Sequence, residues 1–286
     1  MQPAKLCMAS ISLNGNIAIN YYMLLSDEVL ADETAYMQFT MVDGTVTRIP
    51  VADGIRAEYN GETYYAFSCA VDSKEMTDDV VCQFFYEGGS TAPFTYKVQT
   101  YANNILAKSG NDTMKALVRA MLHYGAASQI HFGYNTDNLA NAELAAPDYS
   151  DVSIEGFDVI SGQGTELAKF YSASLILKSE TTLRFFFQVD SAATFTATYN
   201  GQTLEVKQRS GLYYVDVVGI AAKDLDEDVT ITINDGTNTA GVSFNPMSYC
   251  QGVLNDTTGA FDRNIKDVVA ALYLYNQAAN IYFKES

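Results

Sequence analysis

The sequence predicts an α+β protein made of two tandem copies of one module, each with an antiparallel β-sheet or sandwich packed on one long, buried C-terminal helix and one short helix. Three observations predict this fold. Segments of the first half of the chain align in order with segments of the second half. Turn-forming dipeptides separate runs rich in aromatic and β-branched residues, which is typical of antiparallel strands. Each half then ends in a segment whose apolar residues follow helical spacing.

The internal repeat consists of four blocks that keep their order and nearly their spacing. The aligned blocks are 34–43 with 181–190, 63–84 with 212–233, 100–106 with 248–254, and 117–132 with 268–283. Chance can produce one such match, but not four collinear ones. The period is that of a whole domain, so the sequence predicts a domain duplication and not a solenoid.

Turn signals locate the strands in each half. Asn14-Gly15, Asn60-Gly61 and Asn200-Gly201 favour tight hairpins, because both central residues of a type I′ turn need positive φ. The pairs Asp43-Gly44 and Asp235-Gly236 indicate further turns. Runs such as 17–25, 36–42 and 183–189 are therefore expected to be strands.

Capping residues and apolar spacing locate the helices. Asn111, Asp112 and Thr113 precede a helical pattern over residues 114–132, and Asp262 or Asn264 opens the matching helix of the second half. Residues 268–283 carry no charge, so we expect that helix to be buried nearly all round. Shorter helices are expected before each long one, over residues 98–107 and 247–254.

A polar, alanine-rich stretch over residues 133–152 has no periodic pattern and indicates a linker. The expected organisation is a first module over 1–134, a linker over 135–152 and a second module over 153–286. A linker of this length is long for a tight turn, so we expect it to lie against one of the modules.

Charge and hydropathy exclude several partners. The chain of 286 residues has 34 acidic and 17 basic side chains and a formal charge of −17, which disfavours nucleic acid and anionic membrane surfaces. No apolar run is long enough to span a bilayer, and no basic segment precedes an apolar one at the start. We expect no membrane insertion, and either a cytoplasmic protein or a monomeric piece of a larger secreted chain.

The repeat indicates how the cysteines are used. In the alignment Cys69 meets Val218, Cys82 meets Ile231 and Cys250 meets Ala102. Replacement by small apolar residues is typical of buried free thiols, and we favour that interpretation over a disulfide. Titration of the denatured, unreduced protein distinguishes the two.

The titratable residues form no recognisable catalytic or metal-binding motif. His123 and His131 lie more than two helical turns apart, too far to share a metal by themselves. Residues 224–228 resemble a calcium loop in composition but lack its glycine and its bidentate glutamate, so a solvated loop is expected and a weak calcium site is the alternative. There is no serine elbow, P-loop or dinucleotide fingerprint. We therefore expect no catalytic, metal or cofactor residues and no cofactor, although two distant glycosidase carboxylates need no motif.

Tyrosine dominates the aromatic composition, with 20 tyrosines and no tryptophan. Tyrosine is enriched at protein interfaces, whereas sugar-binding platforms often use tryptophan. Strand alternation directs Tyr64 away from the core, and the repeat assigns the same direction to Tyr213. Both are candidate ligand-binding residues; the alternative is that each packs under a helix or loop.

The segments SLNGNIAINYYMLLSDEV, AYMQFT and LVRAMLHYGAASQIHFGYNTDNLAN resemble a poorly characterised module of large multidomain surface proteins of anaerobic gut Firmicutes. The resemblance covers most of the first copy and is weak in the second, and it assigns no catalytic residues. It implies an extracellular, cell-surface or secreted, non-catalytic protein. Related surface proteins engage either host proteins, immunoglobulin among them, or polysaccharide.

The leading hypothesis is a surface binding or adhesion module for a protein ligand, with host immunoglobulin as the candidate. The first alternative is a carbohydrate-binding module of a polysaccharide-utilisation protein. The second is a structural spacer that holds other domains away from the cell wall. Because residues common to both copies maintain the fold, we expect the ligand surface where the copies differ or along the linker.

Overall fold

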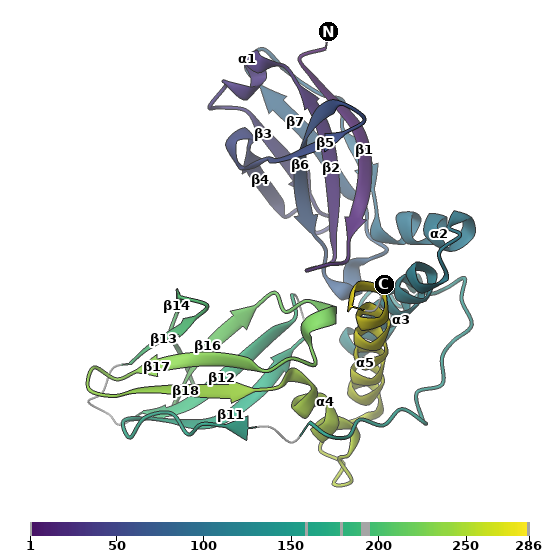
Figure 1. Cartoon of the computed structure of the whole chain (residues 1–286). Helices are drawn as coiled ribbons and strands as arrows, with labels where there is room; N and C mark the ends of the chain where they lie inside the picture. The colour runs from purple at the N-terminus through teal and green to yellow at the C-terminus, as the bar shows by residue number, and fades with distance from the viewer. Residues whose placement is uncertain (1, 158–159, 178–179, 190–194, 285–286) are drawn as a thin grey trace.

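The computed structural model describes residues 2–157, 160–177, 180–189 and 195–284, which form a mixed α+β fold in two halves. Each half contains two antiparallel sheets followed by helices. In Figure 1 the two halves extend in different directions from a central group of helices, where the C-terminus also lies. The predicted α+β class is confirmed.

The first half has two antiparallel sheets. Its strands are β1 (Ala4–Ser12), β2 (Ala18–Leu25), β3 (Tyr36–Thr40), β4 (Val46–Pro50), β5 (Ile55–Tyr59), β6 (Glu62–Ala70), β7 (Val80–Tyr86), β8 (Gly89–Ser90) and β9 (Phe94–Tyr96). Sheet A has the order β1-β2-β6-β5. Sheet B has the order β4-β3-β7, and both β8 and β9 pair with β7 at its other edge.

The second half repeats this strand order. Its strands are β10 (Ile160–Ser161), β11 (Ala168–Ile176), β12 (Thr182–Val189), β13 (Thr196–Tyr199), β14 (Gln202–Leu204), β15 (Lys207–Arg209), β16 (Leu212–Val218), β17 (Val229–Asn234) and β18 (Thr239–Phe244). Sheet D, with the order β11-β12-β16-β15, matches sheet A strand for strand. Sheet C, with the order β10-β18-β17-β13-β14, matches sheet B and adds β10 at the edge.

A β-bulge lies at the same place in β1 and β11. The pairing register shifts between Leu6 and Met8 in β1, and between Phe170 and Ser172 in β11. Strand β12 therefore occupies the place of β2. The sequence alignment of residues 181–190 with residues 34–43, which include β3, is wrong, because alternating aromatic and β-branched runs look alike in any inward-facing strand.

The ungapped alignment of β6 with β16 is wrong by one residue. The Val71 N–H donates to the Ile17 carbonyl, and the Gly219 N–H donates to the Thr181 carbonyl at the equivalent end of the second half. Cys69 therefore corresponds to Val217, which is 2% exposed, and not to Val218, which is 57% exposed. A shift of one residue in a strand reverses the face of every side chain.

Two of the three predicted Asn-Gly hairpins are confirmed. Asn60 and Gly61 have φ of 51° and 79°, and Asn200 and Gly201 have φ of 49° and 77°. Asn14-Gly15 lies instead in a wider loop, since β1 and β2 pair only up to Ser12 and Ala18.

The predicted helices are confirmed close to their expected bounds. They are α2 (Val98–Lys108), α3 (Asp112–Phe132), α4 (Pro246–Leu254) and α5 (Arg263–Lys284), with a short α1 (Asp27–Leu30) after β2. The Asn111 side chain accepts a hydrogen bond from the Met114 N–H, and the Asp262 carboxylate accepts one from the Ile265 N–H. These caps satisfy N–H groups that the first helical turn leaves unpaired.

The long helices occupy a different position from the one predicted. Helix α3 packs against α5 and against the 3-10 turn η2 (Ser73–Glu75), while α5 packs against the equivalent turn η3 (Ala222–Asp224). The two helices thus join the halves at the ends of the sandwiches (Figure 1). Helix α5 is not buried all round, since Leu274 and Ile281 are 38% and 46% exposed. An uncharged helix face does not have to be covered.

The segment predicted as a linker lies against α3. The Gln129 amide donates to the Asn138 carbonyl at 3.0 Å and accepts from the Ala140 N–H at 2.8 Å. Ala140 is 2% exposed. Residues 135–140 are therefore held by a buried side chain of α3.

Two glycines with similar φ differ in their surroundings. Gly162 and Gly236 have φ of 86° and 88°. A Cβ atom on Gly162 would lie 2.1 Å from the Gly241 carbonyl oxygen in β18, whereas one on Gly236 meets nothing within 4 Å. We expect Gly162→Ala to lower the free energy of unfolding by about 2–3 kcal/mol and Gly236→Ala by about 1 kcal/mol, measured by urea denaturation. Equal losses would contradict the close approach of residue 162 to β18.

Candidate functional site

The structure places the first candidate tyrosine on the outer side of sheet A. Tyr64 is 7% exposed, and its hydroxyl donates to the Glu62 carboxylate at 2.8 Å. Its direction away from the core agrees with the strand alternation, because the neighbouring Phe67 and Cys69 are buried in the core. Little of the ring is open to a ligand.

The second candidate, Tyr213, faces the core. It lies opposite Phe187 across the β12–β16 pairing and meets Phe195 edge to face, with ring centroids 6.2 Å apart. The expectation that Tyr213 shares the outward direction of Tyr64 is wrong. The cause is the one-residue shift in the alignment, which makes Tyr65 the equivalent of Tyr213.

The four cysteines are free thiols, and three of them are buried. Cys69 is 6% exposed, Cys82 2% and Cys250 0%. Burial raises the pKa of the Cys69 thiol to about 11 and those of Cys82 and Cys250 to about 12. Cys7, at the bulge of β1, is only partly buried.

Thiol chemistry tests this arrangement. At pH 8 we expect iodoacetamide to alkylate Cys7 in the native protein and all four cysteines in urea, since only an accessible thiolate reacts. The raised pKa values also predict that stability falls above about pH 9, because unfolded thiols then ionise while buried ones stay protonated. Mass spectrometry counts the alkylated thiols. Rapid native alkylation of Cys82 or Cys250 would contradict their burial.

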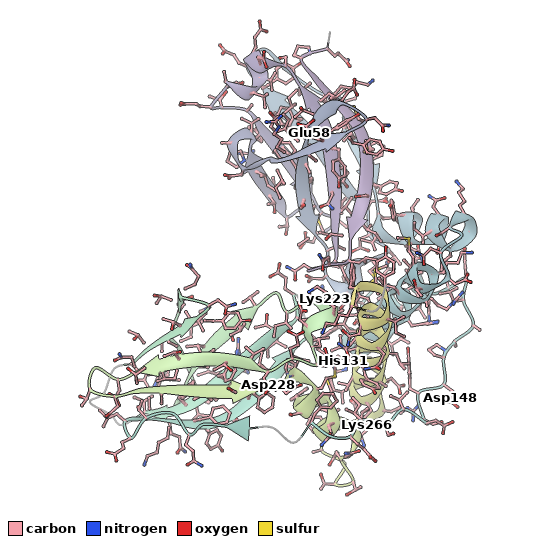
Figure 2. All side chains as sticks on the ribbon, viewed as in Figure 1. Glu58, His131, Asp148, Lys223, Asp228 and Lys266 are labelled. Carbon is pink, nitrogen blue, oxygen red and sulfur yellow. The ribbon has the colours of Figure 1, made fainter. Side chains whose placement is uncertain are left out.

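The histidines do not form a shared site. The Nδ1 atom of His123 lies 2.9 Å from the Asn141 amide nitrogen, and burial, together with Arg119, lowers the pKa of His123. His131 packs edge to face on Phe132, with centroids 4.7 Å apart, and Figure 2 shows it at the central helices. Among the described residues, no group of three or more His, Cys, Asp or Glu side chains is placed to hold a metal ion.

The acidic segment 224–228 is partly solvated, as expected from its composition, since Glu227 and Asp228 are exposed, but it also makes structural contacts. The Asp226 carboxylate accepts a hydrogen bond from Asn280 at 2.9 Å, and Asp228 accepts one from Asn245 at 2.9 Å. Lys284 pairs with Glu227 at 2.8 Å. These contacts fasten α4 and α5 to the end of the second sandwich.

Within the described ranges, no helix is long and apolar enough to cross a membrane.

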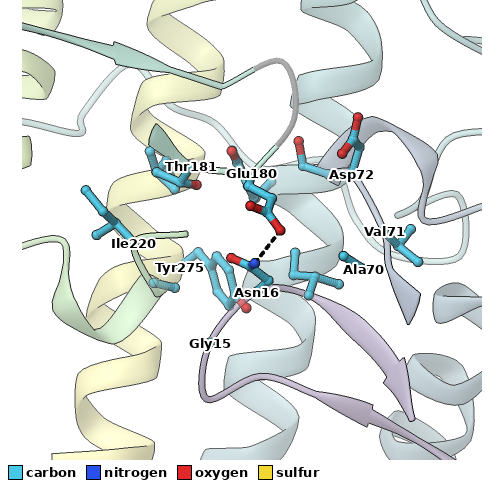
Figure 3. A pocket seen from close by; sticks show the side chains of 14 residues that line it. Gly15, Asn16, Ala70, Val71, Asp72, Glu180, Thr181, Ile220 and Tyr275 are labelled. Carbon is cyan, nitrogen blue, oxygen red and sulfur yellow. Dashed lines mark hydrogen bonds between the residues drawn. The ribbon is translucent and has the colours of Figure 1, made fainter. Parts of the chain in front are cut away.

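Equivalent residues of the two halves meet at the junction (Figure 3). The Asn16 amide donates to the Glu180 carboxylate at 2.6 Å, which links the β1–β2 loop to the loop before β12. Tyr124 of α3 stacks on Tyr275 of α5, with ring centroids 6.0 Å apart and an interplanar angle of 23°. These contacts join the loops and the long helices of the two halves at one place.

The junction also encloses a small cavity of about 40 Å³ beside the Tyr124 and Tyr275 rings. The two tyrosines are 3% and 2% exposed. The Tyr275 hydroxyl has no hydrogen-bond partner among the described residues, and burial raises the pKa of both tyrosines. The space is enough for a water molecule between polar groups, but not for an organic ligand.

The outer face of sheet D carries the most distinctive polar cluster. Arg184 binds Asp216 through two hydrogen bonds, Nε to Oδ1 at 2.7 Å and Nη2 to Oδ2 at 2.9 Å. Its guanidinium lies over the Tyr214 ring, 4.0 Å from the centroid. Phe186 adds a second ring 5.8 Å from Tyr214. Such bidentate and cation–π contacts hold both side chains in one geometry.

Strand alternation explains why these residues share a face. In β12 the residues Leu183, Phe185 and Phe187 are 0% exposed, so Arg184 and Phe186 between them face outward. On the neighbouring strand β11 the bulge residue Tyr171 is 57% exposed. Local sequence patterns do not identify this cluster, because the alternation within 183–187 and 214–217 brings these residues to one face only in the observed register.

The equivalent face of sheet A has different chemistry. Asn20 pairs with Ser68 where Arg184 pairs with Asp216, and Tyr22 pairs with Ala66 where Phe186 pairs with Tyr214. The second-half cluster consists of Arg184, Phe186, Tyr214 and Asp216, and we call it the outer-face cluster. It lies where the two halves differ.

Comparison of the chain with models of known protein families and with curated protein sequences found no match.

Proposed function

We propose that the chain is two copies of one module, used as a non-catalytic binding unit of an extracellular surface protein. The matching strand orders of sheets A and D and of sheets B and C support the duplication. So do the bulges that follow Leu6 and Phe170 and the stacking of Tyr124 on Tyr275. On this proposal, the modules lie on either side of the 135–152 segment.

The observation that carries the binding function is the outer-face cluster. Tyrosine and arginine are, with tryptophan, the residues enriched at protein-binding hot spots. Here they are held rigid by Asp216 and by each other, so that little conformational entropy is lost when a ligand binds. The first half has Asn20 and Ser68 at the equivalent place, so the fold does not require the cluster.

The ligand that fits this cluster best is a protein. A sugar ring stacks on a free aromatic face, but the Arg184 guanidinium lies 4.0 Å over the Tyr214 ring. The resemblance to surface modules of gut Firmicutes implies either a host protein or polysaccharide, and the covered Tyr214 ring favours the host protein, with immunoglobulin as the candidate. The charge of −17 disfavours nucleic acid.

Two other functions remain as alternatives. A carbohydrate-binding module would use the rings of Tyr171 and Phe186, of which Tyr171 is 57% exposed. A spacer would have no ligand and would tolerate substitution of every surface tyrosine. The carbohydrate-binding module and the spacer predict different results when protein binding and polysaccharide binding are both measured.

The test immobilises the whole chain and measures the binding of purified immunoglobulin, alongside capture from host secretions. Affinity electrophoresis in polysaccharide gels and a glycan array are run in parallel. The proposal expects saturable binding to immunoglobulin or another identified host protein, and no retardation by polysaccharide. Retardation without protein binding would contradict it in favour of the carbohydrate module, and neither signal would favour the spacer.

A further inference from the structure

Charged side chains are distributed unevenly over the second sandwich. The described strands of sheet C carry none. The strands of sheet D carry four basic residues, Lys169, Arg184, Lys207 and Arg209, and one acidic residue, Asp216. The strands of sheet D therefore have a net positive charge in a protein whose formal charge is −17.

The strand pairing places these charges on the outer face of sheet D, around the aromatic rings of the outer-face cluster. Lys207 pairs with Tyr214, and Arg209 is two residues further along β15. Lys169 pairs with the residue of β12 that lies two positions after Phe186. Side chains two residues apart in a strand point to the same face. We call this charged outer side of sheet D the basic face.

The basic face has a fixed centre and an exposed rim. Arg184 is held by the bidentate ion pair of the cluster, and its side chain is 16% exposed. Lys207 pairs at 2.9 Å with Glu205, whose side chain is 77% exposed. Lys169 and Arg209 are exposed, and neither forms an ion pair with another described residue. A central aromatic patch surrounded by a polar, solvated rim is typical of protein interfaces.

The first half lacks this charge at the equivalent place. The strand pairing makes Ile55 and Ala57 of β5 the equivalents of the two basic residues of β15. Lys169 has a basic equivalent, Lys5, on the same side of the β-bulge. The fold therefore does not require the basic residues of β15.

We propose that the protein partner of the outer-face cluster presents an acidic surface, whose carboxylates meet Lys169 and Arg209 while its apolar groups cover the aromatic rings between them. This rests on the proposed binding function, since it names the charge of the ligand for the same face. The chain as a whole is acidic and repels such a partner, so the basic face orients the encounter.

The spacing of the charges favours a protein over an anionic polysaccharide. Lys169 and Arg209 lie on the two edge strands of sheet D, three strand spacings or about 14 Å apart. The Arg184 guanidinium between them is already bound to Asp216. A polysaccharide with one carboxylate on each sugar meets no continuous row of cations here. A folded protein can place separate acidic groups around an apolar centre.

The test measures binding of the whole chain to a random copolymer of glutamate and tyrosine, which supplies carboxylates and aromatic rings. We expect binding that weakens steeply between about 20 and about 200 mM salt, because salt screens exposed charges. At the lower salt concentration, Lys169→Gln and Arg209→Gln should each weaken binding about threefold, and the double variant about tenfold. Lys5→Gln removes the same charge from the equivalent position of the first half and should change the affinity less than about twofold.

Polygalacturonate, an acidic polysaccharide without aromatic groups, is measured alongside the copolymer. If it bound as tightly as the copolymer and lost affinity equally in the double variant, the basic face would belong to an anionic glycan and the proposal would be overturned. Absence of copolymer binding at the lower salt concentration would also overturn it. So would copolymer binding that the double variant leaves unchanged, or an equal loss in Lys5→Gln.

Immunoglobulin binding separates this inference from the proposed function. If immunoglobulin bound through Tyr214 but its affinity responded neither to salt nor to the double variant, the acidic partner would be wrong and the proposed function would stand. If the copolymer bound at Lys169 and Arg209 while no host protein bound, the preference of the basic face for acidic polypeptide would hold and the proposed host ligand would be wrong.

Discussion

Replacing Tyr275 with alanine is expected to lower the free energy of unfolding by about 4 kcal/mol, as large aromatic-to-alanine changes in cores do. Tyr275 is 2% exposed and stacks on Tyr124 across the junction. The substitution leaves a cavity between α3 and α5, which are packed against each other. Urea denaturation followed by far-UV circular dichroism measures the loss.

Tyr275→Phe is the matched control. The Tyr275 hydroxyl has no hydrogen-bond partner among the described residues, so its removal should change stability by less than about 1 kcal/mol. If the phenylalanine variant lost as much as the alanine variant, the hydroxyl rather than the stacked ring would hold the junction.

The second large effect concerns the first half produced alone, as residues 1–152. We expect it not to be a stable monomer, because removing α5 exposes Tyr124 and the surrounding face of α3. Since like residues meet across the junction, that face is close to self-complementary and should form a dimer or an aggregate. Analytical ultracentrifugation and dye binding to exposed apolar surface measure this. A monomer as stable as the whole chain would contradict the role of the α3–α5 contact.

The sequence predicted the helices better than the strands. Capping residues such as Asn111 and Asp262 mark helix starts locally, and the structure places both as caps. The place of a strand in a sheet depends on non-local pairing. The repeat alignment therefore assigns residues 181–190 to the place of β3, whereas β12 pairs in the place of β2. The position of α3 against α5 also depends on contacts between the halves, which local patterns do not encode.

The candidate site was harder to predict for the same reason. A one-residue shift in the alignment of β16 predicts an outward direction for Tyr213, whereas Tyr213 faces the core and Tyr214 and Asp216 face outward. The period of two in a strand makes any such error a reversal of faces. The expectation that a ligand surface lies where the two copies differ identifies particular residues only when the strand register is known.

Binding measured across a matched set of variants tests the central claim, that the chain recognises a protein through the outer-face cluster. The set is Tyr171→Ala and Tyr214→Ala in the second half and Tyr22→Ala on the equivalent face of the first half, each checked for folding by circular dichroism. With immunoglobulin as the probe, the account expects Tyr214→Ala to weaken binding about tenfold or more, Tyr171→Ala to weaken it to a smaller extent, and Tyr22→Ala to leave it unchanged. Unchanged affinity of the folded Tyr214→Ala variant, or an equal loss in Tyr22→Ala, would contradict it.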